Sequence, residues 1–290
     1  MNELNRCKPL LGTYVEVSLA ADLSDFELVS LSIRMFERIS TIQRQMSFHD
    51  SQSKLSQINR QAINSPVGLS QDYIELFSII SDLNSDSDGY FDPSIAPNLM
   101  QAKVLPCNGY NDAVYQGSGP LEMNTNEFGC WQDLTLANDQ LIKRKPLMID
   151  LGGIAKGYAV DKAIELVPEG IEACVNAGGD LRFTHWLNQI VGVKHIQVER
   201  ESCDTVTTSP IDMLAPAIAT TSAYYYDGTS HIVNPKDGAL QNDARTYSVF
   251  APSCVLADGL TKLACLLYTV SNDKLKDILA SYGAILIVTD

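Results

Sequence analysis

The sequence predicts an α+β protein in which mixed or antiparallel sheets and packed helices form one composite domain over residues 1–290. The length of 290 residues, with 45% hydrophobic and 19% charged residues, provides a sizeable core and excludes the disordered, collagen-like and coiled-coil classes. Segments with the period of strands and segments with the period of helices both occur along the chain. No repeat, low-complexity tract or Pro/Ser-rich linker divides the chain, which favours a single domain.

The first half of the chain begins with a predicted strand at residues 13–19, where Val15 and Val17 alternate with polar neighbours. A helix follows, because apolar residues between Leu28 and Met46 recur every three or four positions, and Ser24 or Asp25 can cap it. A polar loop with one short helical turn comes next, and a second amphipathic helix is predicted at residues 71–85. Residues 85–97 form a cluster of turn signals.

The second half contains more short strands. Residues 100–145 are irregular and indicate only weak strands. A short apolar strand at residues 146–150, a glycine-rich turn and an amphipathic helix then follow one another. Further strands are predicted at residues 173–183, which fold back through a tight turn, and at 217–226, 231–235 and 246–252; a last helix at 257–268 and a strand at 284–289 complete the chain.

The net charge and the cysteine pattern restrict the binding partners and the cellular compartment that we expect for the protein. A net charge of −14 argues against a nucleic-acid groove or an anionic membrane surface, so any phosphate ligand needs local donors or a metal ion. The seven cysteines contain no CxxC pair, which favours reduced thiols over a disulfide framework or a zinc site. No stretch is apolar enough for a signal peptide or an integral membrane segment, and a cytoplasmic location is expected.

The strongest local motif is the glycine-rich turn at residues 149–157. Gly152 and Gly153 allow a ligand to approach the backbone closely before a helix N-terminus, where amide groups and the helix dipole favour phosphate. Lys156 adds a positive charge. The motif matches neither GxGxxG nor the Walker pattern, so a purely structural turn remains the alternative on local evidence.

Four other features have both a functional and a structural interpretation. Residues 176–180 present either ligand-binding amides or an ordinary hairpin turn, and the local pattern favours the hairpin. His231 is suited to acid–base chemistry or is structural. Asp92 either orients a catalytic group or forms an Asx turn, and Asp258 is either an oxygen ligand for Mg²⁺ or an N-terminal helix charge, the second being favoured.

Taken together, the order of these segments resembles the ApbE-type FAD:protein FMN transferases over nearly the whole chain. Four segments resemble the N-terminal half of that family: residues 11–17 (LGTYVEV), 46–48 (MSF), 50–59 and 89–94 (GYFDPS). Five resemble its second half: residues 149–161, 176–180 (NAGGD), 219–222 (ATTS), 231–238 and 257–258. The block at residues 149–161 is the most specific of them.

The resemblance implies an ApbE-like fold and a phosphoester transfer. The family cleaves FAD with Mg²⁺ and moves FMN through its phosphate onto a Ser or Thr hydroxyl of an acceptor flavoprotein, releasing AMP. His231 then falls at the position of a catalytic histidine, Asp258 at that of the metal carboxylate, and the Ala155 carbonyl at that of a second metal ligand. Phe48 would stack on the isoalloxazine ring. The residues that would bind FAD are Phe48, Asp92, Gly152, Gly153, Lys156, Asn176, Gly178, Gly179, Asp180 and Thr221.

Lys262 departs from the family pattern, which has a metal-ligating Thr at this position. A protonated lysine has three donors and no acceptor, so it cannot coordinate Mg²⁺, and one helical turn from Asp258 it competes with the ion. Lys262 either supplies a fixed positive charge to catalysis or marks a flavin pocket without metal-assisted transfer. Thr261 is expected to point about 100° away around the helix. Thr221-Ser222 replaces the family's usual Ser-Gly, and the added side chain leaves a ligand less space to approach the backbone there.

Two other functions therefore remain alternatives to FMN transfer. In an FAD pyrophosphatase, water replaces the protein hydroxyl, and FMN and AMP are both released. In a non-catalytic FAD-binding protein, Lys262 pairs with the ligand and no bond is broken.

Overall fold

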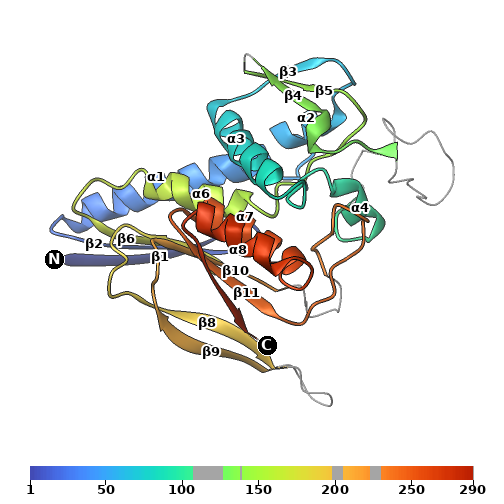
Figure 1. The fold of residues 1–290 in the computed structure, drawn as a ribbon. Helices are drawn as coiled ribbons and strands as arrows, with labels where there is room; N and C mark the ends of the chain where they lie inside the picture. Colours follow the sequence, from blue (N-terminus) through green and yellow to red (C-terminus); the bar gives the residue numbers. More distant parts are fainter. Residues whose placement is uncertain (107–126, 138, 198–204, 223–229, 290) are drawn as a thin grey trace. The chain divides into compact units, whose positions relative to one another are not determined.

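The computed structural model describes residues 1–106, 127–137, 139–197, 205–222 and 230–289 (Figure 1). The described residues divide into two compact units: unit 1 comprises residues 1–43, 154–225 and 242–290, and unit 2 comprises residues 44–153 and 226–241. Helices and antiparallel sheets occur together, which confirms the α+β class. The single domain stays a prediction. Cys107, Cys203 and the predicted strand extension at 223–226 lie outside the described residues.

A seven-stranded sheet, antiparallel throughout, forms the centre of the described part of unit 1. In spatial order its strands are β1 (Asn2–Leu10), β2 (Thr13–Ala21), β6 (Glu172–Ala177), β7 (Asp180–Phe183), β10 (Ala217–Ser222), β11 (Thr246–Ala251) and β12 (Ile285–Thr289). The predicted first strand is confirmed as β2. The edge strand β1, which precedes it, was not predicted.

Helix α1 (Asp25–Met46) packs on the first strands of the sheet, as its apolar spacing predicts. Arg6 of β1 donates to the Ser32 hydroxyl at 2.8 Å, and the Lys8 ammonium lies 4.9 Å from the centre of the Phe36 ring. Val17 of β2 lies directly opposite Arg6 in the β1–β2 pair, so its side chain is on the same face of the sheet, and it is fully buried. The long apolar face of α1 and the alternating face of β2 therefore share one core.

Helices α6 (Ala155–Ile164) and α7 (Cys254–Leu267) pack against the middle of the sheet. Ala219 of β10, Ala251 of β11 and Ala257 of α7 form a fully buried cluster, and their small side chains let the helix approach the strands closely. The helix begins at Cys254, three residues earlier than predicted. Asp258 therefore lies in the second turn, which removes its interpretation as a charge at the helix N-terminus.

Two further elements of unit 1 were not predicted. One is the hairpin of β8 (Ile190–Gln197) and β9 (Thr205–Asp212). Its Val193 belongs to a second buried apolar cluster, together with Ile218 of β10 and Phe250 of β11. Helix α8 (Asn272–Ser281) packs on α7 and β12. Because β11 has α7 and this second cluster to bury its side chains, all six of its residues are buried.

Unit 2 contains short helices and a three-stranded sheet of order β3-β5-β4. Its elements are α2 (Lys54–Arg60), β3 (Pro66–Gly68), α3 (Gln71–Asp86), α4 (Ala96–Gln101), η2 (Trp131–Asp133), β4 (Leu134–Ala137) and β5 (Gln140–Lys143). The predicted helix at 71–85 is confirmed as α3. The Phe77 ring of this helix packs edge to face against two other rings, with centroid distances of 5.3 Å to Tyr73 and 5.1 Å to Trp131.

Two strands predicted in this unit were wrong. At residues 146–150 only Met148 forms a bridge, to Ile95. The Asn59 side chain instead takes the hydrogen bonds that a neighbouring strand would provide: it donates to the Ile149 carbonyl and accepts from the Ile149 amide, both at 2.8 Å. Residues 231–235 form one bridge, from Val233 to Leu240, in a loop closed by local turns. None of the described helices has the length and the apolar run that a membrane crossing requires.

Candidate functional site

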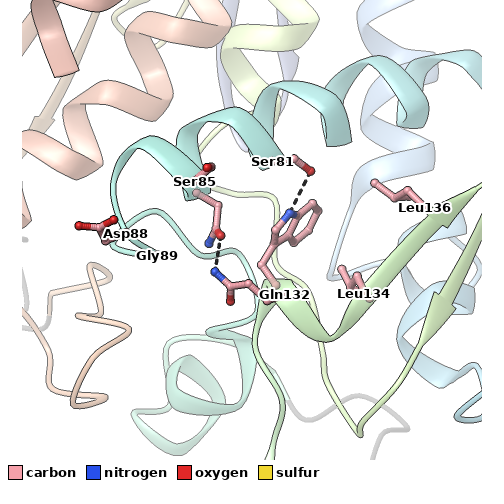
Figure 2. A pocket seen from close by; sticks show the side chains of 9 residues that line it. Ser81, Ser85, Asp88, Gly89, Gln132, Leu134 and Leu136 are labelled. Atoms are coloured by element: carbon pink, nitrogen blue, oxygen red, sulfur yellow. Dashed lines mark hydrogen bonds between the residues drawn. The ribbon is translucent and has the colours of Figure 1, made fainter.

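A pocket of about 680 Å³ lies in unit 2 beside the end of α3 (Figure 2). Four of its lining residues form two hydrogen bonds: the Trp131 indole donates to the Ser81 hydroxyl at 3.1 Å, and the Gln132 amide donates to Asn84 at 2.6 Å. Its lining contains Asp88 and neither lysine nor arginine, which disfavours a phosphate ligand. None of the sequence-predicted site residues lines it.

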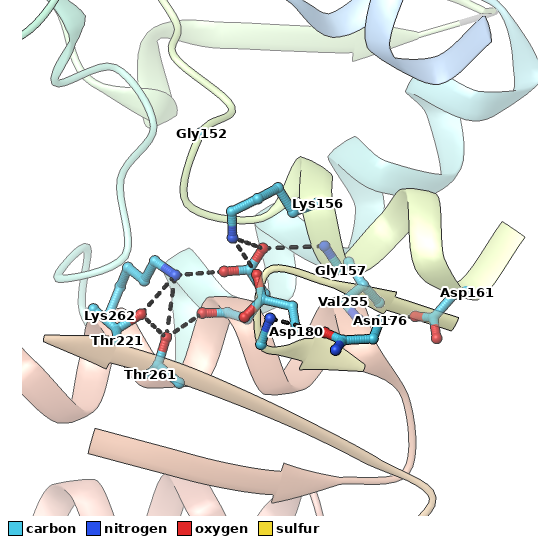
Figure 3. Close-up of polar contacts among 12 residues, drawn as sticks. Gly152, Lys156, Gly157, Asp161, Asn176, Asp180, Thr221, Val255, Thr261 and Lys262 are labelled. Atoms are coloured by element: carbon cyan, nitrogen blue, oxygen red, sulfur yellow. Dashed lines mark hydrogen bonds and ion pairs between the residues drawn. The ribbon is translucent and has the colours of Figure 1, made fainter. Parts of the chain in front are cut away.

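A cluster of charged and hydroxyl side chains in unit 1 is the stronger candidate (Figure 3). Four elements contribute to it: α6, the start of β7, the end of β10 and the second and third turns of α7. Its members, called here the lysine–aspartate cluster, are Lys156, Asp180, Thr221, Asp258, Thr261 and Lys262. Five of them were predicted as site residues, and the structure brings these five together.

Asp258 is the central carboxylate of the cluster and has no exposed surface. Its Oδ2 atom accepts a hydrogen bond from the Gly157 amide at 3.1 Å and lies 3.7 Å from the Lys156 ammonium. Its Oδ1 atom accepts from the Lys262 ammonium. Burial acts to raise the pKa of Asp258, but the two lysine charges and these hydrogen bonds outweigh it and hold the pKa below its ordinary value. The carboxylate is therefore ionised.

Lys262 donates to three acceptors. Besides Asp258, its ammonium reaches the Thr221 hydroxyl at 3.0 Å and the Thr261 hydroxyl at 3.2 Å. The expectation that Thr261 points away from the site was wrong. Its hydroxyl donates back to the Asp258 carbonyl at 2.7 Å and meets Thr221 at 2.8 Å, because β10 lies against this side of α7.

Lys156 and Asp180 form a second ion pair at the edge of the cluster. Asp180 is almost fully buried, whereas a third of the Lys156 side chain is exposed. Burial alone would lower the pKa of Lys156, but the carboxylates of Asp258 and Asp180 raise it above its ordinary value. Lys156 thus presents a permanent, partly exposed cation in the first turn of α6, which is the kind of group that binds a phosphate.

Gly157 and Asp161 position α7 and therefore the two site residues that it carries. A Cβ atom at Gly157 would lie 2.3 Å from the Cys254 carbonyl oxygen, so only glycine permits this approach of the helices. One turn later, Asp161 accepts from the amides of Cys254 and Val255 at 2.9 and 2.8 Å and pairs with Arg182 at 2.8 Å. Asp161 thus caps α7 across the helix pair. Neither residue was predicted as a site residue, although their spacing of four places both on one helix face.

The second glycine turn is a hairpin between β6 and β7. Gly178 and Gly179 both have positive φ, 68° and 106°, and the Asn176 side chain accepts from the Gly179 amide at 2.9 Å. This is the structural alternative that the local pattern favoured. A ligand-binding role for Asn176, Gly178 and Gly179 stays a prediction.

The other predicted residues belong to unit 2, except Ala155, which is the first residue of α6. Phe48 is buried and His231 is half-buried. Asp92 accepts from the Ser94 amide, the Ser94 hydroxyl and the Trp131 amide at 2.8, 2.6 and 3.1 Å, so its carboxylate holds the turn. In the glycine-rich turn, the Gly152 amide donates to Asp150 at 3.1 Å. The roles predicted for Phe48, Asp92, Gly152, Gly153 and His231 stay predictions.

A resident Mg²⁺ does not fit the residues at Asp258. Mg²⁺ requires oxygen ligands at about 2.1 Å in an octahedron. Both oxygens of this carboxylate already accept hydrogen bonds from N–H donors, and one of those donors is an ammonium. Among the residues that the structure describes, no group of three or more His, Cys, Asp or Glu side chains is arranged to hold a metal ion.

The fold and the cluster together define a class: an α+β protein with a buried charged site between a helix pair and an antiparallel sheet. The model of the ApbE family matches residues 11–283. The chain therefore belongs to the ApbE family.

Related proteins agree with this assignment. The FAD:protein FMN transferase of Vibrio cholerae serotype O1 is 27% identical over 268 residues, which cover 87% of this chain and 78% of the relative. The FAD:protein FMN transferase of Chlamydia pneumoniae is 27% identical over 275 residues, covering 85% and 79%. The crystal structure of the ApbE protein from Thermotoga maritima superposes with a TM-score of 0.80 at 21% identity, covering 99% of this chain and 94% of that one. The flavin transferase ApbE from Vibrio cholerae gives 0.78 at 24%, covering 99% and 93%.

Proposed function

We propose that this protein is an FAD:protein FMN transferase, which cleaves FAD and attaches FMN through its phosphate to a Ser or Thr hydroxyl of an acceptor flavoprotein. The observation that carries the proposal is the lysine–aspartate cluster of an ApbE-family chain. In a protein of net charge −14, the partly exposed Lys156 ammonium beside Asp258 is a local cationic donor for a pyrophosphate. The curated relatives with this activity support the proposal.

The proposed reaction forms one phosphorus–oxygen bond and breaks another. The acceptor hydroxyl oxygen attacks the FMN phosphorus, and the bond from that phosphorus to the oxygen bridging to the AMP phosphate breaks. The hydroxyl proton passes to His231 as general base, and AMP leaves with the bridging oxygen. Lys156 stabilises the negative charge that develops on the pyrophosphate oxygens.

The test is to incubate the purified protein with FAD and a candidate acceptor flavoprotein. We expect an acceptor mass gain equal to FMN less water, together with an equal amount of AMP. Release of free FMN and AMP with no change in acceptor mass would instead identify an FAD pyrophosphatase. Bound FAD with neither product would identify a flavin-binding protein.

Two histidine variants test the proposed base. We expect His231→Ala to lower the rate of AMP release by about a hundredfold or more, which is the usual contribution of general-base catalysis. His185 is exposed, and its ring contacts the neighbouring Thr184 hydroxyl at 3.2 Å, so His185→Ala is a matched control that should leave the rate unchanged. Equal rates for both variants would remove His231 from the mechanism.

A further inference from the structure

The lysine–aspartate cluster already contains its own cation. The Lys262 ammonium has three N–H groups and three acceptors within reach: Asp258 Oδ1, Thr221 Oγ1 at 3.0 Å and Thr261 Oγ1 at 3.2 Å. Each donor of the ammonium can thus be satisfied by an oxygen of the protein. Only 14% of the Lys262 side chain is exposed, so water contributes little to this coordination.

The acceptors around this ammonium come from two elements, as the ligands of a bound ion would. Asp258 and Thr261 lie three residues apart on α7, and Thr221 lies near the end of β10. The hydroxyls of Thr221 and Thr261 also contact each other at 2.8 Å, which fixes both oxygens. A carboxylate and two fixed hydroxyls are hard oxygen donors that suit a divalent cation equally well. In this chain the Lys262 ammonium binds these three oxygens instead.

The charge of the cluster also opposes a divalent ion. Asp258 is fully buried, and a buried carboxylate requires a compensating cation. Lys262 on Oδ1 and Lys156 at 3.7 Å from Oδ2 provide that compensation. An added Mg²⁺ would have to displace the Lys262 ammonium from Asp258 Oδ1, and it would meet repulsion from both lysines.

We propose that the Lys262 ammonium is a built-in cation that takes the place of a divalent metal ion at Asp258, so that the site works without Mg²⁺. It is fixed on Asp258, Thr221 and Thr261 and acts as a permanent positive charge toward the phosphates of the nucleotide. This inference rests on the proposed function for its catalytic consequence. Its metal-binding consequence is independent of that function and can be measured without flavin.

The first test measures binding of Mn²⁺, a paramagnetic stand-in for Mg²⁺, to the purified protein by electron paramagnetic resonance. We expect no saturable Mn²⁺ site in the unmodified protein. In Lys262→Thr, the side chain exchanges three donors for an acceptor oxygen, and we expect a saturable site at least about tenfold tighter than any binding to the unmodified protein. Lys262→Thr combined with Asp258→Asn should lose that site again.

A matched control separates the site from a general loss of positive charge. Lys276 pairs with Asp273 on the surface of α8, and both side chains are largely exposed. Lys276→Thr changes the net charge equally and should leave Mn²⁺ binding as it is in the unmodified protein. The inference would be overturned if the unmodified protein bound Mn²⁺ saturably and Asp258→Asn abolished that binding. This result does not require Lys262→Thr to fold.

The second test measures AMP release from FAD with excess chelator and with added Mg²⁺. We expect equal rates for the unmodified protein and a Mg²⁺ requirement for Lys262→Thr. Activity of the unmodified protein that disappears with chelator and returns with Mg²⁺ would overturn the inference. Failure of the proposed function has a different signature: no AMP is released under either condition, while the Mn²⁺ result still stands or falls by itself.

Discussion

Gly157 is the residue at which α6 meets the first turns of α7. An added Cβ atom would lie 2.3 Å from the Cys254 carbonyl oxygen and 2.9 Å from the Asp258 Cβ atom, and a backbone carbonyl cannot move aside without shifting the helix. We expect Gly157→Ala to lower the free energy of unfolding by about 1–3 kcal/mol or more, because overpacking strains both helices. Urea denaturation followed by circular dichroism measures this loss.

The control for this substitution is Gly68→Ala in β3. No atom lies within 4 Å of a Cβ atom built at Gly68, and its φ is not in the left-handed region. The same added methyl group should therefore change the stability by less than about 0.5 kcal/mol. If Gly157→Ala were as stable as Gly68→Ala, the close helix approach would be wrong.

Lys143 is a buried lysine that has carbonyl partners. Its ammonium donates to the Asn59 carbonyl at 2.8 Å and lies 3.5 Å from the Leu147 carbonyl, with the residue 4% exposed. Burial lowers the pKa of Lys143 from 10.5 to about 8. Between these two values the folded protein binds fewer protons than the unfolded chain, so this residue makes the stability rise with pH from about 8 to about 10.5.

The Lys143→Met variant isolates this effect from the other lysines. We expect the stability of the unmodified protein relative to the variant to increase across that pH interval, by up to about 1.4 kcal/mol per pH unit, and to be independent of pH below about 7. Urea unfolding of both proteins at a series of pH values measures the difference. A difference that stays constant from pH 7 to 10 would contradict the lowered pKa.

At the residue scale, the sequence predicted which residues share a helix face and not which residues face each other across elements. The spacing of four between Asp258 and Lys262 was sufficient to predict their contact. The direction of Thr261 was predicted from helix geometry alone and was wrong, because its hydroxyl bonds back to the Asp258 carbonyl and meets Thr221 of another element. Such contacts depend on packing between distant segments.

At the element scale, Asp161 controls the start of α7. Its carboxylate accepts from the amides of Cys254 and Val255 and pairs with Arg182, and only 5% of the side chain is exposed. We expect Asp161→Ala to lower the free energy of unfolding by about 2–4 kcal/mol, since it removes a helix cap and leaves a partly buried arginine without its carboxylate. Urea denaturation measures the loss of unfolding free energy. A lower rate of AMP release from FAD would report that Asp258 and Lys262 are displaced.

Asp273, in the first turn of α8, is the matched control for Asp161. Its side chain is 97% exposed and pairs only with exposed Lys276 among the interactions that the structure records for it. Asp273→Ala should change the stability by less than about 0.5 kcal/mol and leave activity unchanged. Similar losses for the two aspartates would show that Asp161 acts as an ordinary helix charge and not as a cap.

Elements with a strong apolar period were predicted from the sequence, and elements that depend on their neighbours were not. The predictions of α1, α3, β2 and the β6–β7 turn follow from local spacing. The missed strand β1 lies at a sheet edge and is mostly polar. The predicted strand at 146–150 failed because the Asn59 side chain replaces a strand as hydrogen-bond partner, and no local pattern indicates that substitution.

At the scale of the whole molecule, the strand and helix periods along the chain were enough for the α+β class, and the order of motifs was enough for the family. The sequence also identified five of the six members of the lysine–aspartate cluster, because four lie in those motifs and Lys262 stands where the family pattern has a threonine. Beyond the contact of Asp258 with Lys262, it could not identify the pairing between members of different elements. Whether Lys262 faces Asp258 alone or is shared with two threonines depends on the distance between β10 and α7, which is set by the alanines packed between them.

The net charge of the molecule predicts how salt affects flavin binding, if FAD is the ligand. The protein carries −14, and the lysine–aspartate cluster is itself neutral, with two lysines and two aspartates. The overall field therefore repels the anionic pyrophosphate of FAD during its approach. Raising the salt from about 0.01 M to 0.15 M shortens the screening length from about 30 Å to 8 Å.

We expect the association rate of FAD, measured by stopped-flow quenching of flavin fluorescence, to rise about twofold or more over this range of salt. Riboflavin has the same ring system and no phosphate, so its association rate should not change. An association rate for FAD that falls with salt would mean that Lys156 and Lys262 attract the nucleotide from a distance. The lysines would then determine capture of the ligand as well as its chemistry, and the acidic surface would play no part in the encounter.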